Sequence, residues 1–393
     1  MRPKMAAPGT RFRPYAFLAA TWAVNVCINA FYIAPAPVFP EIIQDLHITN
    51  AQAGSLISFY LVAILLFQLP SGYVVDRVDP RKVIAAASLV FLGLSIVMSY
   101  VPRYDALLSL RILAGIPVAF IFAPSAFLVS RAFERTPGRA VGVFLSAPPA
   151  GVSLGNLLAP SIALHYGWPA VLVAFNLPLL LLVPAFLQAA RGLPARRHEA
   201  FGIRDFLAAF RSRELWKVGL VFACSYAAYI FYASWTPTYV RSADLLAPVL
   251  VGTFSAMIPA AGIVSRPLGG YLAETRFRKD KRWVPGLAFS LLLLTSLAIP
   301  YLGVTAIPLF VASGFLAQFP FSVYYLFSSQ ILPPKFRGTA YAFMNTTSII
   351  GGAISPALAG FLVDVTGSFF ASFVMIAALA LLGLGLLLAV RER

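Results

Sequence analysis

The residue of this sequence best suited to bind an anion is Arg266, which lies in a long apolar segment that begins near Pro248. Glu274 follows eight residues later, so in a helix the backbone of Arg266 lies about 12 Å deeper than that of Glu274. Charges inside a membrane-spanning segment are costly and mostly mark transport pathways. The alternative is that the side chain extends to the nearer membrane surface and only anchors the helix end. We interpret Arg266 as a functional cation.

Other polar side chains occur at similar depths in apolar segments and could line a cavity together with Arg266. A single side chain of this kind often forms only a hydrogen bond between helices. Prolines near two of these segments, Pro35, Pro37 and Pro237, favour a cavity, because water or neighbouring helices there can satisfy the freed backbone groups. The predicted substrate-binding residues are Arg266, Gln68, Asn29, Tyr32, Tyr229, Tyr232, Gln318 and Asn345.

The composition of the chain indicates a membrane protein. Of the 393 residues, 60% are hydrophobic and only 11% are charged, whereas soluble domains carry about 25% charged residues. Twelve apolar stretches approach or exceed the roughly 20 residues that a bilayer core requires. They lie near 15–39, 51–75, 83–101, 105–130, 139–163, 169–190, 215–240, 248–273, 283–303, 306–330, 338–363 and 369–390.

The basic residues predict the orientation of these spans. If the N-terminus lies inside, 26 of the 30 lysines and arginines fall in inner segments. The positive-inside rule therefore predicts a multi-pass protein of the cytoplasmic membrane with both termini cytoplasmic. The net charge of +16 is then a topology signal and an attraction to anionic membrane lipid. It does not indicate nucleic-acid binding.

The two halves of the sequence resemble each other at an offset of about 200 residues. Phe31-Tyr32 matches Phe231-Tyr232, and similar matches continue through glycines and alanines as far as Gly167 and Gly367. Two six-span halves related in this way are typical of rocker-type transporters. We predict an all-α integral membrane protein with twelve transmembrane helices in two pseudo-symmetric six-helix bundles. The predicted units are residues 1–190, a cytoplasmic linker at 191–214, and residues 215–393.

Two motifs resemble signatures of the major facilitator superfamily. Residues 72–82, Gly-Tyr-Val-Val-Asp-Arg-Val-Asp-Pro-Arg-Lys, resemble its loop 2–3 motif, with mild departures at Asp79 and Pro80. Arg111 and Gly115 resemble its fourth-span motif. The resemblance implies the major facilitator fold and alternating access, and we expect a monomer. It also implies an inner gate, for which the candidates are Asp76, Arg77, Arg81, Arg111 and Glu274.

The stretch Arg-Pro-Leu-Gly-Gly-Tyr at 266–271 is similar to the eighth span of monocarboxylate transporters. It also resembles oxalate/formate exchangers and nitrate transporters, and in these families an arginine at this level binds the substrate. The sequence departs from their patterns: Gly262 stands where monocarboxylate transporters often have Asp, and Gln68 stands where nitrate transporters have a second Arg. One cation then faces one neutral amide across the pseudo-twofold axis.

These features predict a secondary transporter for a small organic anion, and a monocarboxylate in particular. Acidic residues and histidines are absent from the middle of the spans, so the sequence shows no obvious proton relay within the protein. Symport with protons, uniport and anion exchange all stay open. The alternatives are an inorganic anion carrier of the nitrate type, an exporter of amphipathic drugs, and a non-transporting sensor. We expect no enzymatic activity, cofactor or metal site, because the sequence shows no nucleophile–base pair, metal cluster or phosphate loop.

Overall fold

The computed structural model describes residues 13–75, 77–101, 103–133, 136–191, 193, 211–331 and 337–390. Within these ranges the secondary structure is helical, and twelve segments are long and apolar enough to cross a membrane. The predicted count of twelve spans is confirmed. The predicted linker, 191–214, falls mostly outside the described residues.

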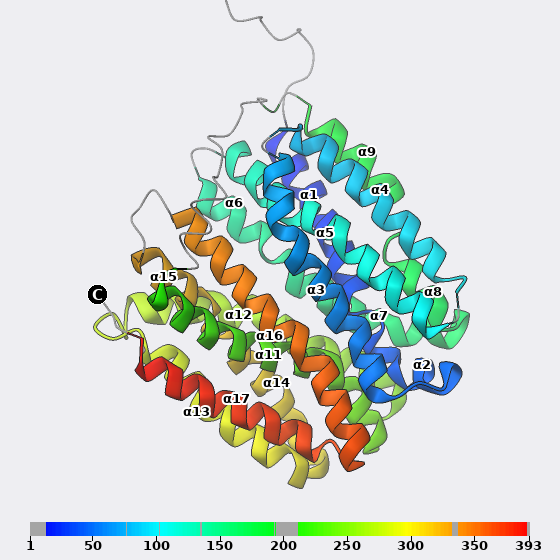
Figure 1. Cartoon of the computed structure of the whole chain (residues 1–393), viewed down its shortest axis with the longest axis vertical. Helices are drawn as coiled ribbons and strands as arrows, with labels where there is room; N and C mark the ends of the chain where they lie inside the picture. The colour runs from blue at the N-terminus through cyan, green and yellow to red at the C-terminus, as the bar shows by residue number, and fades with distance from the viewer. Residues whose placement is uncertain are drawn as a thin grey trace, which may run out of the picture.

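The N-terminal half comprises the helices before the linker (Figure 1). They are α1 (Pro14–Ile33), η1 (Ala36–Val38), α2 (Phe39–Leu46), α3 (Asn50–Val75), α4 (Pro80–Met98), α5 (Tyr104–Ala132), α6 (Pro137–Phe144), α7 (Ala147–Tyr166), α8 (Trp168–Ala174) and α9 (Leu179–Ala189). The C-terminal half follows the linker. Its helices are α11 (Arg213–Ser242), α12 (Pro248–Glu274), α13 (Trp283–Ala298), η2 (Ile299–Tyr301), η3 (Gly303–Ala306), α14 (Ile307–Gln318), α15 (Phe321–Ile331), α16 (Arg337–Thr366) and α17 (Phe370–Leu388).

Prolines explain why several spans consist of two helices. Pro148 and Pro149 follow the break between α6 and α7, and Pro320 lies between α14 and α15. Proline lacks the backbone N–H that continues a helix, and its ring clashes with the preceding turn. The first span bends in the same way after Ile33, where Pro35 and Pro37 precede α2.

The two halves pack against each other mainly through α3 on α16 and α7 on α12. Small residues allow this close approach. Gly54 lies directly against the backbone carbonyl of Pro356, and Gly360 lies against that of Asn50. A side chain at either glycine would separate α3 from α16.

Polar contacts join the halves at one end of the bundle, which we call the closed end. The carboxylate of Asp364 accepts hydrogen bonds from the backbone and side-chain amides of Asn50 and from the backbone amide of Ala51, at 2.8–2.9 Å. Arg241 donates to Glu41 at 2.7 Å across the same boundary. Deeper in the membrane, the backbone amide of Ala357 donates to Ser58 at 3.1 Å.

The opposite end, which we call the basic end, repeats one turn structure in both halves. Arg81 pairs with Asp79 at 2.7 Å and also donates to the carbonyl of Ala190. Arg282 pairs with Asp280 at 2.9 Å and donates to the carbonyl of Val390. The guanidinium of Arg81 lowers the pKa of the Asp79 carboxyl below its usual value. The two Asp-x-Arg turns lie 201 residues apart and are a repeat match that was not predicted from the sequence.

Candidate functional site

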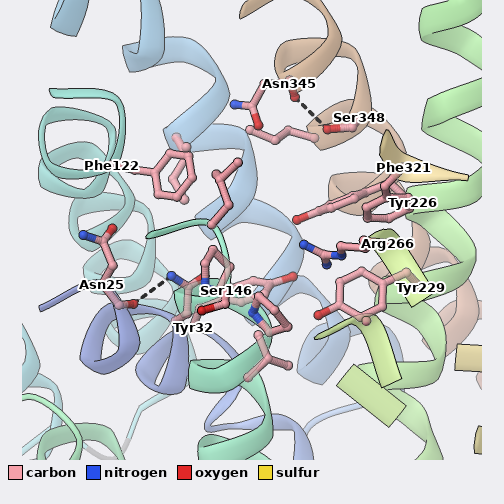
Figure 2. Close-up of a pocket in the computed structure, with 18 of the residues that line it drawn as sticks. Asn25, Tyr32, Phe122, Ser146, Tyr226, Tyr229, Arg266, Phe321, Asn345 and Ser348 are labelled. Atoms are coloured by element: carbon pink, nitrogen blue, oxygen red, sulfur yellow. Dashed lines mark hydrogen bonds between the residues drawn. The ribbon is translucent and has the colours of Figure 1, made fainter. Parts of the chain in front are cut away.

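A cavity of about 400 Å³ lies between the two halves (Figure 2). It is bounded toward the closed end by the contacts between α3 and α16 and extends toward the basic end, where Gln68, Gly142 and Asn345 line it. The N-terminal half contributes Asn25, Asn29, Tyr32, Tyr60, Gln68, Phe122 and Ser146, among others. The C-terminal half contributes Tyr226, Tyr229, Arg266, Phe321, Tyr325 and Asn345, among others.

Arg266 is half-buried in the wall formed by the C-terminal half. Its guanidinium carbon lies 4.8 Å from the centre of the Phe321 ring and 5.8 Å from that of Tyr229. One terminal nitrogen donates to Gln318, whereas the Nε atom is buried without a hydrogen-bond partner. Among the described residues Arg266 has no carboxylate partner. Its positive charge therefore stays available to a bound anion.

Gln318 fixes the position of this guanidinium. The side chain of Gln318 is fully buried, and its amide nitrogen donates to the carbonyls of Gly314 and Ile258 at 3.0 and 3.2 Å. Those two bonds turn the amide oxygen toward Arg266, from which it accepts at 2.7 Å. Gly262 makes room for this amide, because a Cβ atom at position 262 would overlap it. A neutral amide from another helix thus fills the space beside Gly262.

Six of the eight predicted binding residues line the cavity: Arg266, Gln68, Asn29, Tyr32, Tyr229 and Asn345. Gln318 lies behind Arg266 and holds it. Tyr232 points elsewhere, because its hydroxyl forms a 2.9 Å hydrogen bond with Ser296 of α13. The cavity is also lined by three aromatic residues that were not predicted: Tyr226, Phe321 and Tyr325. Tyr226 could have been found, since it lies three residues before Tyr229 and shares its helix face.

Arg111, a predicted gate residue, is fully buried in the N-terminal half. It donates to the carbonyls of Tyr32, Leu56 and Phe31 at 2.7, 2.9 and 3.2 Å. Its guanidinium carbon lies 4.7 Å from the centre of the Tyr60 ring. Pro35 lacks the amide hydrogen that would bond the carbonyl of Phe31 in a continuous helix. The structure therefore places Arg111 as a cross-link between α1, α3 and α5, behind the cavity wall.

Three of the other predicted gate residues lie at the basic end: Arg77, Arg81 and Glu274. Asp76 lies outside the described residues. Arg77 is exposed in the turn after α3, and Glu274 is exposed at the last residue of α12. Arg81 bonds within its own half, as described above. Their role in closing this end stays a prediction.

The model of the Major Facilitator Superfamily matches residues 21–348. The probable sulfoacetate transporter SauU of Cupriavidus necator is 26% identical over 94% of this chain and 90% of its own length. The hexuronate transporter of Bacillus subtilis is 24% identical, over 87% of this chain and 86% of its own. The 4-hydroxybenzoate transporter PcaK of Pseudomonas putida is 30% identical over 43% of this chain and 39% of its own.

Among solved structures, a bacterial homologue of the human lysosomal transporter Spinster, in an inward-facing and unoccupied conformation, is similar to this chain. The TM-score is 0.80 at 16% identity, and the match covers 98% of this chain and 99% of the other. The likeness establishes a common fold.

Proposed function

Because the chain belongs to the major facilitator superfamily and is an integral multi-pass membrane protein, we propose that it is a secondary transporter for a small organic monoanion, in particular a monocarboxylate. The observation that carries the proposal is the guanidinium of Arg266, which meets the central cavity without a carboxylate partner among the described residues. A guanidinium can bind a carboxylate through two parallel hydrogen bonds.

The relatives support an organic substrate, since their names refer to sulfoacetate, hexuronate and 4-hydroxybenzoate. The preference for a monoanion comes from the cavity, in which Arg266 is the one cation among the lining residues of the described chain. A cavity of about 400 Å³ lies within the range typical of organic ligands. It is larger than a nitrate ion needs.

The arrangement of the halves supports alternating access. The polar contacts of Asp364 and Arg241 hold the closed end together, while the cavity extends toward the basic end. By the positive-inside rule we place the basic end and both termini in the cytoplasm. The structure then corresponds to a conformation open to the cytoplasm. Acidic side chains are absent from the described cavity lining, so if protons are coupled to transport, we assign the coupling proton to the substrate itself.

The test is uptake of labelled lactate, benzoate, gluconate and nitrate into proteoliposomes, with and without a pH gradient. We expect uptake of at least one of the organic acids, and we expect Arg266→Gln to abolish it. Arg266→Lys should keep only part of the uptake, because an ammonium group lacks the planar pair of donors that a guanidinium has. Arg278→Gln, at an exposed arginine that follows the same helix, is the matched control. Binding without movement of any solute would favour a sensor, and uptake that survives Arg266→Gln would refute the assignment of the site.

A further inference from the structure

The part of the cavity wall that surrounds Arg266 consists of aromatic rings. The guanidinium carbon lies in the corner between the rings of Phe321 and Tyr229, whose planes are nearly perpendicular at 87°. Tyr226 stacks on Phe321 with 5.8 Å between the ring centroids, and it is a half-buried residue that lines the cavity itself. An organic acid whose carboxylate reaches Arg266 therefore places its body beside these rings.

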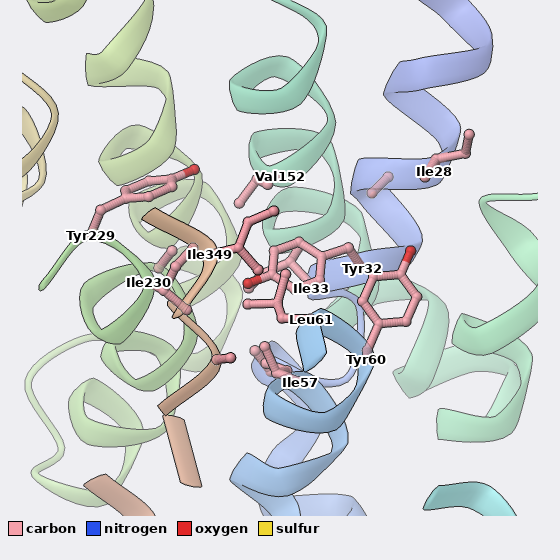
Figure 3. Close-up of a cluster of buried hydrophobic side chains, with 14 of the residues drawn as sticks. Ile28, Tyr32, Ile33, Ile57, Tyr60, Leu61, Val152, Tyr229, Ile230 and Ile349 are labelled. Atoms are coloured by element: carbon pink, nitrogen blue, oxygen red, sulfur yellow. The ribbon is translucent and has the colours of Figure 1, made fainter. Parts of the chain in front are cut away.

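The rest of the space in front of Arg266 is bounded by apolar side chains. Phe122 of α5 extends into the cavity from the N-terminal half, on the wall opposite Arg266 (Figure 2). Leu61, Val152 and Ile349 also line the cavity, and they belong to one apolar cluster to which both halves contribute (Figure 3). The body of a bound acid therefore contacts rings and aliphatic side chains from both halves.

The serines on the cavity lining use their hydroxyl hydrogens within the protein. Ser146, Ser322 and Ser348 donate to backbone carbonyls at 2.7–2.8 Å. The side chains of Gln68 and Asn345 lie toward the basic end of the cavity. An acid with several hydroxyl groups would thus exchange water for few partners beside Arg266, and each hydroxyl left without a partner lowers the affinity.

The geometry of a guanidinium–carboxylate pair favours a flat body. A carboxylate that accepts two parallel hydrogen bonds from a guanidinium lies in its plane. In an aromatic carboxylate the ring is conjugated with the carboxylate, so the ring continues this plane. Such a ring can form edge-to-face or offset-stacked pairs with the aromatic side chains of the wall. A saturated ring is puckered and has no π-system with which to form these pairs.

We propose that the substrate is an aromatic monocarboxylate, whose carboxylate binds Arg266 and whose ring packs against Tyr226, Tyr229 and Phe122. This inference rests on the proposed function, which assigns the carboxylate to Arg266. The C-terminal half supplies the cation and two of the rings, and the N-terminal half supplies the third. The bound acid then contacts both halves at once.

The experiment measures binding of three acids to the purified full-length protein by equilibrium dialysis. The probes are benzoate, cyclohexanecarboxylate and quinate, which are monoanions that share one seven-carbon skeleton and have an aromatic, a saturated and a polyhydroxylated ring. We expect benzoate to bind about fivefold more tightly than cyclohexanecarboxylate, because of its aromatic contacts. The hydrophobic effect does not produce this order, since the saturated ring carries at least as much apolar surface. Quinate should bind at least about tenfold more weakly than cyclohexanecarboxylate.

Variants at position 226 test the contribution of the wall. Tyr226→Leu should reduce the preference for benzoate over cyclohexanecarboxylate about threefold, whereas Tyr226→Phe, which keeps the ring, should retain the preference. The matched control is Tyr239→Leu, because Tyr239 is also a half-buried tyrosine of α11 with aromatic neighbours but does not line the cavity. Phe122→Leu makes the same test on the opposite wall, and it decides the question if Tyr226→Leu does not fold.

The inference is overturned if quinate binds best, if cyclohexanecarboxylate binds as tightly as benzoate, if benzoate does not bind, or if the leucine variants at 226 and 122 weaken benzoate and cyclohexanecarboxylate equally. Arg266→Gln separates this inference from the proposed function. If the acids bind through Arg266 without a preference for the aromatic ring, only this inference fails. If benzoate binds equally well to Arg266→Gln, the proposed function fails.

Discussion

The amide oxygen of Gln318 accepts a 2.7 Å hydrogen bond from the guanidinium of Arg266, 52 residues away in the sequence. Gln318 is neutral, so it orients the guanidinium without cancelling its charge. An acidic residue in the same place would act as a built-in competitor for the substrate. The site thus combines a fixed position with an available charge, which an anion carrier requires.

Gln318→Glu should convert this arrangement into an internal ion pair. The change is nearly isosteric and places a carboxylate beside Arg266. At an effective dielectric constant near 20, a close charge pair contributes about 4 kcal/mol before desolvation, so we expect anion affinity to fall at least tenfold. Gln318→Met keeps the charge free and removes only the positioning bond, and it should cost less. The measurement is equilibrium binding of the best-transported acid to each variant. Equal losses of affinity in the two variants would contradict this account.

Gly262→Ala should weaken binding by displacing the side chain of Gln318. The added Cβ atom would overlap the Gln318 amide and move it from Arg266. We expect a several-fold higher KM for uptake. The control is Gly93→Ala in α4, where a Cβ atom meets nothing within 4 Å. If Gly262→Ala transports like wild type, the position of the Gln318 amide does not depend on the space beside residue 262.

Gln68→Arg should change the preferred charge of the substrate. Gln68 and Arg266 line the same cavity from opposite halves and match across the repeat. A second guanidinium would stabilise the second carboxylate of a dianion, and without a dianion the two cations should repel each other. We expect wild type to favour lactate over malonate in competition assays at fixed pH, and the variant to narrow or reverse that preference. Wild-type preference for malonate, or unchanged selectivity in the variant, would show that the two residues do not share a substrate.

Gly54→Val should open the closed end. The valine side chain would collide with the carbonyl of Pro356 and separate α3 from α16, which favours the alternative conformation. Cysteines at positions 50 and 364, whose native side chains are in contact, would report the change after Cys27 and Cys224 are replaced by Ser. Their cross-linking should be efficient in the parent and much reduced with Gly54→Val. Gly93→Val is the control, and undiminished cross-linking in Gly54→Val would argue against a closed end held by this contact.

The spans could be predicted from the sequence because hydrophobicity and length are local properties of the chain, and the internal repeat because corresponding positions about 200 residues apart carry the same residues. A stretch such as 370–388 is apolar on every face, so its length alone identifies a membrane span. The isolated charge of Arg266 within an apolar segment was equally visible, and the repeat offset was sufficient to match it with Gln68. These features need no knowledge of the neighbouring helices.

Only the tertiary structure decided which polar groups face the cavity. Tyr32 and Tyr232 match in the repeat, yet one lines the cavity and the other bonds Ser296. Arg111 and Arg266 are both cations within spans, yet the first satisfies backbone carbonyls and the second faces the cavity. A helix surrounded by lipid and other helices is apolar all round, so its sequence carries little information on which face points inward. Packing against specific neighbours sets that rotation, and it is settled only when the whole bundle is assembled.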